Sequence, residues 1–221
     1  MFSTARTTFA LLLTLVLVIP SFAFELPLTD HSVREAYFLG QHHDASTESA
    51  LKPYLHTFPP PKLGAYISDI RLLTPYAQVI DISNSHSSGY SAQQAAADYH
   101  ARGEIVIVRF HIRFTPTYSY IKSGNDRFDA DTKQGIHVRS EDFWQDFKAG
   151  LSQDHGQWLQ PLSRQGEPVY VETSEGGGIM DGAYIWLTFE AREVLSETVT
   201  AEIYTPDGQY VTSDFDLATL R

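Results

Sequence analysis

The chain contains no cysteine among its 221 residues. Disulfides, thiol nucleophiles and cysteine-ligated zinc are therefore excluded, and no lipid can be attached through a cysteine. Stability must instead come from the burial of apolar side chains. The chain has the composition for this, because 43% of its residues are hydrophobic and 13% are aromatic, values typical of globular proteins.

Basic residues are also scarce. Sixteen lysines and arginines stand against 27 aspartates and glutamates, which gives a formal net charge of −11. A field of this sign repels nucleic acids and anionic membrane surfaces. Nucleic acid is therefore not an expected partner.

Only one long, largely apolar run is present, at residues 9–19, and it is too short to span a bilayer, which takes about 20 residues. Arg6 precedes this run, and Ser21 and Ala23 supply the small residues of a cleavage site. This order predicts a signal peptide over residues 1–23, with an uncleaved anchor as the alternative. We therefore expect an exported protein, periplasmic or extracellular, with no transmembrane segment after cleavage.

Short catalytic and cofactor motifs are missing. The chain has no GxxxxGK[ST] phosphate loop, no GxGxxG, no HExxH and no complete GxSxG elbow. The densest group of potential metal ligands, His42, His43 and Asp44, is interpreted as a solvated loop because adjacent side chains point apart. No cofactor is therefore expected.

The acidic segment at residues 125–131 is a candidate calcium site. Asp126, Asp129 and Asp131 offer the oxygen ligands that calcium prefers. Lys133 stands where an EF-hand loop would continue with an oxygen ligand, and Gly135 comes one position too late. The segment is therefore interpreted as a solvated turn, with calcium binding as the alternative.

Two helical segments are expected before residue 62. Ser32 and Glu35 have the spacing of a capping box, and Gly40 marks the end of the first helix. Apolar residues then repeat at helical spacing over residues 51–58, and the prolines at 59–61 predict an extended connector. The expected domains are a helical N-terminal arm over 24–61 and a β-rich domain over 62–221.

Strands are expected to dominate from residue 65 onwards. Alternating, β-branched and aromatic segments predict strands over residues 66–73, 76–82, 104–115, 157–162, 169–173, 183–191, 198–205 and 209–215. Helices interrupt them over residues 91–102, where Ser91 and Gln94 form a capping box, and over 140–151. The turn at 206–208 predicts a hairpin with Tyr204 opposite Tyr210.

This order of elements predicts the α+β class. We expect an antiparallel β-sandwich-like core, immunoglobulin-like or C2-like, with a helical N-terminal decoration and two helical excursions.

A row of cations is the first candidate site. Arg109, His111 and Arg113 alternate on the polar face of the strand at 104–115. Arginines of this kind bind carboxylate, phosphate or sulfate, so the row is an anion-binding candidate. The alternative is cross-strand pairing with acids such as Asp69 or Asp81.

Aromatic residues form the second candidate site. Alternation places Tyr184 and Trp186 away from the core, and the hairpin register does the same for Tyr204 and Tyr210. If both hairpins belong to one sheet, these four rings form a platform on which sugars stack. The alternative is that the N-terminal helices cover this face.

The predicted function is an exported, non-enzymatic binding or accessory domain. Its expected partner is an envelope protein, a glycan or a small anion. The alternative is a carboxylate-based hydrolase, for example one acting on glycans, for which Glu172, Glu175 and Glu190 are available without a reason to face one another.

Three segments carry a resemblance. Residues 34–41, 73–79 and 90–95 resemble exported bacterial proteins of about this size, over residues 32–115 of the chain. The resemblance implies a periplasmic or cell-surface location, and it implies no role for any residue.

Overall fold

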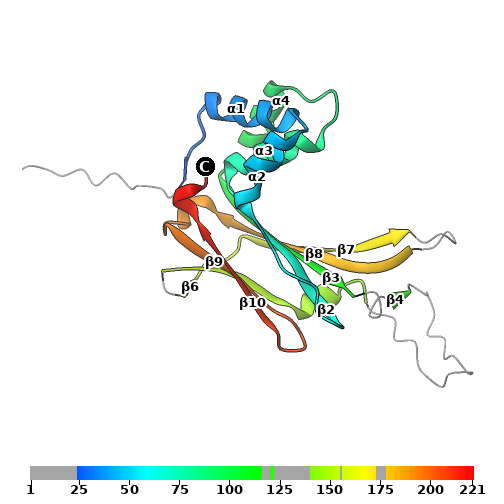
Figure 1. Ribbon diagram of the computed structural model, residues 1–221. Coiled ribbons are helices and arrows are strands. Elements are labelled where there is room, and N and C mark those ends of the chain that lie inside the picture. The colour runs from blue at the N-terminus through cyan, green and yellow to red at the C-terminus, as the bar shows by residue number, and fades with distance from the viewer. Residues whose placement is uncertain (1–23, 116–119, 122–139, 155, 173–177) are drawn as a thin grey trace, which may run out of the picture.

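The computed structural model describes residues 24–115, 120–121, 140–154, 156–172 and 178–221, with the backbone alone at 120–121. Over these residues the chain forms a mixed α/β fold with two antiparallel sheets and four α-helices. The helices gather over one end of the larger sheet, and the smaller sheet lies on the other side of it (Figure 1).

The larger sheet, here sheet I, has the strand order β1-β2-β3-β8, with β7 and β4 both paired to β8. Its strands are β1 (Leu55–Thr57), β2 (Ala65–Leu73), β3 (Ile105–Phe114), β4 (Tyr120–Ile121), β7 (Ser163–Glu172) and β8 (Gly178–Glu190). The smaller sheet, sheet II, has the order β10-β9-β5-β6. Its strands are β5 (Lys148–Gln153), β6 (Gln157–Trp158), β9 (Thr198–Tyr204) and β10 (Tyr210–Asp216).

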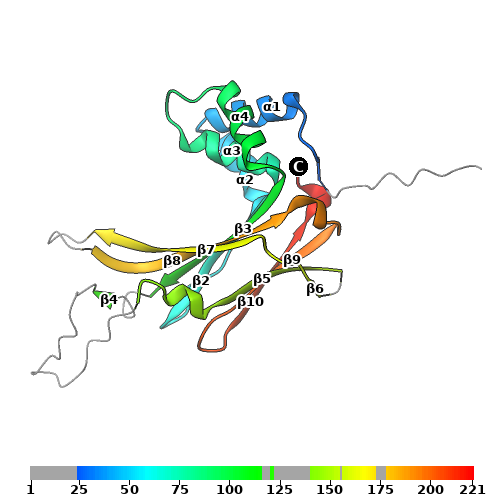
Figure 2. The same cartoon turned by 180° about the vertical axis from the view of Figure 1, so that it is seen from behind.

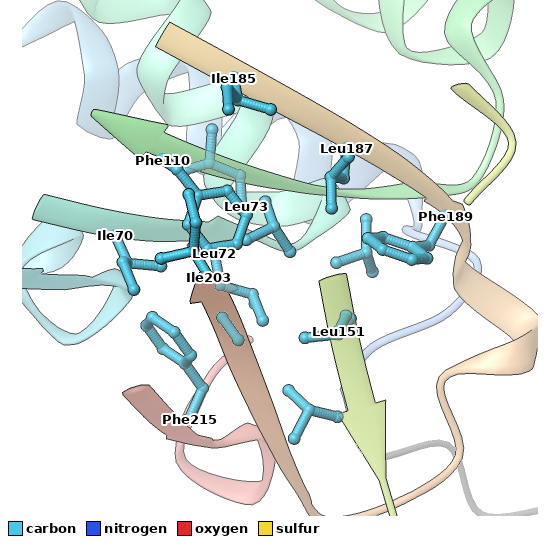
Figure 3. Close-up of a cluster of buried hydrophobic side chains, with 14 of the residues drawn as sticks. Ile70, Leu72, Leu73, Phe110, Leu151, Ile185, Leu187, Phe189, Ile203 and Phe215 are labelled. Carbon is cyan, nitrogen blue, oxygen red and sulfur yellow. The ribbon is translucent and has the colours of Figure 1, made fainter. Parts of the chain in front are cut away.

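The main core lies between the two sheets. Alternate residues along β3 and β8, from Val106 to Phe114 and from Ala183 to Phe189, are buried on the inner face of sheet I. Figure 3 shows how the side chains of both sheets meet: Ile70, Leu72, Leu73, Phe110, Ile185, Leu187 and Phe189 from sheet I, and Leu151, Ile203 and Phe215 from sheet II. The opposite face of each sheet is therefore left for polar and aromatic side chains.

The four helices form a separate layer with a second buried cluster. They are α1 (Asp30–Gln41), α2 (Ala45–Leu51), α3 (Pro75–Ser85) and α4 (Ala92–Arg102). Their cluster includes Val33 and Ala36 of α1, Ile80 of α3 and Tyr99 of α4. The helices before β1 and those between β2 and β3 thus pack as one layer, which Figure 2 shows from behind. Short 3₁₀ turns complete the fold at Lys52–Tyr54, Phe143–Asp146, Ala191–Glu193 and Leu217–Thr219.

Several predicted elements are confirmed. The strands β2, β3, β9 and β10 begin and end within one residue of their predicted bounds. Helix α4 opens with the predicted capping box, in which Ser91 and Gln94 each bond the backbone of the other. Tyr204 pairs with Tyr210, as the turn chemistry predicted. No helix among the described residues is long and apolar enough to cross a membrane.

The strand predicted over 76–82 is wrong, because these residues form α3. Thr74 is the N-cap, its side chain accepts a hydrogen bond from the Ala77 backbone, and Pro75 takes the first helical position. Tyr76, Val79, Ile80 and Ser83 are buried, which is the i, i+3, i+4, i+7 spacing of one helix face.

Three predicted helices differ from the observed elements. The first begins at Asp30, with Thr29 rather than Ser32 as its N-cap. The second, predicted over 51–58, lies earlier, at Ala45–Leu51, and the 3₁₀ turn Lys52–Tyr54 and then β1 follow it. The third, predicted over 140–151, is a single 3₁₀ turn followed by β5, whose residues pair with β9.

Three strand bounds are also corrected. Strand β8 begins at Gly178, five residues before its predicted start at Ala183. The strand predicted over 157–162 is only the two residues of β6, and β7 begins at Ser163, six residues before its predicted start at Val169. Gly166 and Pro168, which have low strand propensity, are held in β7 by pairing with β8.

The cap of α3 leads to a stability prediction. Thr74 is fully buried and its hydroxyl also donates to the backbone carbonyl of Arg221. We expect Thr74→Ala to lower the free energy of unfolding by about 2 kcal/mol, at the upper end for an N-cap, since the buried Ala77 N–H loses its partner and the bond to the Arg221 carbonyl is lost as well. The exposed cap Ser91→Ala should cost only about 0.5–1 kcal/mol. Urea unfolding measures the free energy of unfolding of both variants. An equal decrease in the two would contradict a contribution from the bond between Thr74 and Arg221.

Candidate functional site

The predicted cation row lies on the outer face of sheet I. Arg109, His111 and Arg113 alternate there along β3. Asp69 is the register partner of His111 on β2 and contacts its Nδ1 at 2.8 Å. Asp181 of β8 accepts two hydrogen bonds from Arg113, at 3.1 and 2.9 Å. Carboxylates thus engage His111 and Arg113, so these two are not free for an anion.

Arg109 is paired less closely. Its Nη2 lies 3.6 Å from Asp69 Oδ1, which is an ion pair without a hydrogen bond. Asp81, the other predicted partner of the row, instead accepts a hydrogen bond from Arg71 at 2.8 Å. Carboxylates thus lie beside all three cations of the predicted row, and Arg109 is the least closely held of the three.

Asp69 is the acid on which this face depends. Burial alone would raise the pKa of its carboxyl. The hydrogen bonds from His111 and Ser68, together with the charges of His111 and Arg109, outweigh burial, so the pKa is lowered. Asp69 is therefore an ionised, fixed component of the outer face.

The shared aromatic platform is wrong. Tyr184 and Trp186 lie on β8 in sheet I, whereas Tyr204 and Tyr210 lie on β9 and β10 in sheet II. The cause is pairing: β8 pairs with β3, and β9 pairs with β5, so the two hairpins separate.

The rings of the two aromatic pairs also differ in how exposed they are to solvent. On sheet I the Tyr184 ring stacks on His111 at 4.3 Å, and the Arg109 guanidinium lies 4.9 Å from its centroid. These neighbours within the sheet cover the ring. On sheet II the rings of Tyr204 and Tyr210 stack on each other at 4.4 Å and remain exposed.

A third exposed ring, Trp158, lies on the outer face of sheet II. It is the register partner of Ser152, and its six-membered ring occupies the space above Gly150. A Cβ at Gly150 would lie 1.9 Å from Cζ3 of this ring. Glycine is therefore required for the indole to lie on the sheet. Trp158 is still 52% exposed, so much of the ring meets solvent.

A buried carboxylate lies next to this ring. Glu202 is the register partner of Gly150 and is only 8% exposed. Ser152 Oγ and Tyr210 Oη each donate to one of its two oxygens, both at 2.5 Å. The bond to Glu202 raises the pKa of Tyr210, so the phenol keeps its proton and donates it. We call the surface formed by Gly150, Trp158, Glu202, Tyr204 and Tyr210 the Trp158 face.

A groove of about 630 Å³ adjoins the Trp158 face. Polar side chains line it, among them Ser152, Asp154, Glu197, Thr200, Glu202 and Asp214. Thr200 donates to Asp214 at 2.7 Å, which orients this carboxylate as well. None of the described residues that line the groove is basic. The surface thus combines a ring lying on the sheet with fixed hydrogen-bond acceptors.

The sequence pointed to Tyr204 and Tyr210 but not to the rest of the Trp158 face. Gly150 was expected in a helix, where its pairing with Glu202 has no counterpart. Trp158 was expected in a strand, but nothing local indicates that it folds back onto β5. A glycine within a strand is the one available signal, since it marks a close approach.

The other candidates do not converge. Asp126, Asp129 and Asp131, the calcium candidates, lie outside the described residues, as does Glu175. Glu172 and Glu190 line two different depressions. The described part of the chain holds no group of three or more residues suited to a metal ion.

Comparisons with protein-family models, with curated proteins and with solved structures gave no match, so the functional assignment depends on the geometry of these surfaces.

Proposed function

We propose that the chain is an exported, non-enzymatic binding domain whose Trp158 face binds an oligosaccharide. The observation that carries this proposal is the Trp158 ring, which lies over Gly150, is more than half exposed, and borders the fixed carboxylate of Glu202. The sequence order of Arg6, the apolar run and Ala23 supports export.

The chemistry of sugars fits this surface. One face of a pyranose ring is apolar and stacks on an indole, while its hydroxyls need hydrogen-bond partners. Glu202 and Asp214 supply acceptors that are already oriented, by Tyr210 and Thr200 respectively. Preorganised acceptors reduce the entropy lost on binding.

The charge of the groove limits the kind of sugar. Asp154, Glu197, Glu202 and Asp214 line it, without a basic residue among those described. An anionic sugar would meet this field at close range and be repelled. We therefore propose a neutral or amino-bearing oligosaccharide as the ligand.

We also infer a sandwich-like fold of the immunoglobulin or C2 type. One buried cluster shared by two antiparallel sheets supports this assignment. In such a fold the outer face of a sheet is available for ligands, which suits the position of Trp158.

Trp158→Ala is expected to weaken oligosaccharide binding about tenfold or more while leaving the fold intact, since the ring stacks but does not fill the core. Phe38→Ala is the matched control, because Phe38 of α1 is 54% exposed and far from this face in the fold. Titration calorimetry with neutral, amino-bearing and acidic oligosaccharides measures the effect. Absence of binding to all three classes, or an equal loss in both variants, would refute the proposal.

Gly150→Ala provides a second test that keeps the indole. The new Cβ would displace the ring from the sheet, so binding should fall although Trp158 is present. The hydrolase alternative predicts something different: release of reducing sugar that is lost in Glu202→Gln. We favour binding over hydrolysis because Ser152 and Tyr210 both donate to Glu202 and so hold it as a hydrogen-bond acceptor, whereas the acid of a glycosidase must donate a proton.

A further inference from the structure

Arg109 has unusually few partners for a half-buried arginine. Its side chain is 21% exposed, and its Nε is fully buried without a hydrogen-bond partner. Its described contacts with charged or aromatic groups are the 3.6 Å ion pair with Asp69 and the Tyr184 ring. A guanidinium offers five N–H donors, and leaving them unpaired in a buried setting is costly. Arg113, two residues along the same strand, donates twice to Asp181.

A second arginine lies directly opposite. Arg71 of β2 is the register partner of Arg109 of β3. Its Nε is also buried without a partner, and its only hydrogen bond among the described residues goes to Asp81. Like charges directly opposite each other destabilise a sheet. The buried Oδ1 of Asp69 also has no hydrogen-bond partner, but the two guanidiniums carry more N–H donors than this one atom can accept. An oxyanion would supply further acceptors and the opposite charge.

Solvent reaches Arg71 through a depression, and the Arg109 side chain is itself 21% exposed on the same face of the sheet. A cavity of about 530 Å³ opens between α2, β1 and α3, and Arg71 forms part of its wall. Lys52 and the polar side chains of Thr47, Ser49 and Asn84 also line it. Glu48 and Asp81 line the cavity as well, so any anion must be held by the arginines rather than by the cavity as a whole.

We propose that Arg109 and Arg71 bind a small oxyanion, such as phosphate, sulfate or a carboxylate, on the outer face of sheet I. The site is separate from the Trp158 face, which lies on sheet II. Its ligand differs as well, because the acidic groove beside Trp158 repels anions, whereas the arginine pair carries more donors than its neighbouring carboxylates accept.

The test is titration of the full chain with sodium phosphate, sodium sulfate and sodium acetate, each against sodium chloride at equal ionic strength. Calorimetry gives the affinity, and the tryptophan fluorescence of the chain, to which Trp186 contributes as the register partner of Arg109, gives a second readout. Arg109→Gln should weaken binding about tenfold or more, because charged bidentate bonds are lost. Arg113→Gln removes a charge of the same sign from the same face of β3. It should leave the affinity within about twofold, since the Arg113 guanidinium already donates to Asp181.

Binding by the wild type that is lost in Arg109→Gln and kept in Arg113→Gln supports the site. Phosphate and sulfate are tetrahedral, whereas the carboxylate of acetate is planar. Comparing these titrations identifies which oxyanion geometry the arginine site prefers. Equal weakening in both variants would show a general effect of charge and overturn the proposal. If none of the three anions binds the wild type, Asp69 alone balances the charge of Arg109 and the proposal is overturned. If Arg109→Gln does not fold by circular dichroism, the contrast of Arg71→Gln with Arg113→Gln decides instead.

Discussion

Substitution of Gly182 by alanine is expected to lower the free energy of unfolding by about 3 kcal/mol, the upper end for overpacking a well-packed site. Gly182 lies on β8, opposite Arg113 of β3 and Val169 of β7. A Cβ there would lie 1.9 Å from the carbonyl oxygen of Ile112 and 2.8 Å from its carbonyl carbon. These atoms are backbone, so no side-chain rotation can relieve the contact.

The cost of Gly182→Ala should appear in the pairing of β3 with β8. To admit a methyl group the two strands must move apart, which strains the hydrogen bonds at this end of the β3–β8 ladder, between two central strands of sheet I. Ala183, the next residue along β8, and Met180, two residues before Gly182, are buried and resist that movement. For a chain of this length about 3 kcal/mol corresponds to a fall in Tm of roughly 6–12 °C.

Gly178→Ala is the matched control on the same strand. An added Cβ at Gly178 would make only ordinary contacts with Tyr170, at 3.8 and 3.9 Å. We expect a change within about 0.5 kcal/mol, because surface substitutions without a clash are nearly neutral. Chemical unfolding of both variants checks the pair. Similar stabilities for the two would mean that β3 and β8 separate freely at Gly182.

Much of the β structure could be predicted because its signal is local. In β3 the buried and exposed residues alternate from Ile105 to Phe114, so the period of two is complete. The hairpin of β9 and β10 follows from the turn at 206–208 and its register. By contrast, residues 76–82 are rich in strand-forming side chains, and burial against α1 and α4 overrides that preference in α3.

The candidate site could be predicted only in part, because it depends on which strands become neighbours. Alternation placed Arg109 and Arg113 on one face. It could not indicate that Asp181 neutralises Arg113, since this contact requires the register of β3 with β8, about 70 residues apart in the chain. The Trp158 face likewise requires β5 to pair with β9, and no local pattern encodes that choice.

Asp69→Asn is expected to lower the free energy of unfolding by about 2 kcal/mol at pH 7. The carboxylate is 16% exposed and serves His111, Ser68 and the Arg109 cation. The amide cannot balance the charge of Arg109, and charged hydrogen bonds contribute more than neutral ones. Asp181→Asn is the control: its partner Arg113 is 45% exposed, so that loss should be below about 1 kcal/mol.

The effect of Asp69→Asn should depend on pH with a defined sign. The pKa of Asp69 in the folded protein is lowered from 3.8. A lowered pKa stabilises the fold at pH values above 3.8, and the stabilisation is lost as pH falls through the lower, folded-state value. Unfolding free energies of wild type and variant should therefore converge below pH 3.8. A difference that persists in acid would show that the amide acts by its shape and not by its charge.

Asp69→Asn also distinguishes two roles of Arg109: pairing with Asp69 within the sheet, and binding an oxyanion. If Asp69 only stabilises the sheet, Asp69→Asn lowers stability and leaves phosphate affinity unchanged. If Arg109 binds an oxyanion, Asp69 competes for its donors from 3.6 Å, and removing that charge should tighten phosphate binding severalfold. Stability and affinity then change in opposite directions. Phosphate titration of Asp69→Asn, with Asp181→Asn beside it, measures this, and weaker binding in Asp69→Asn would contradict the competition.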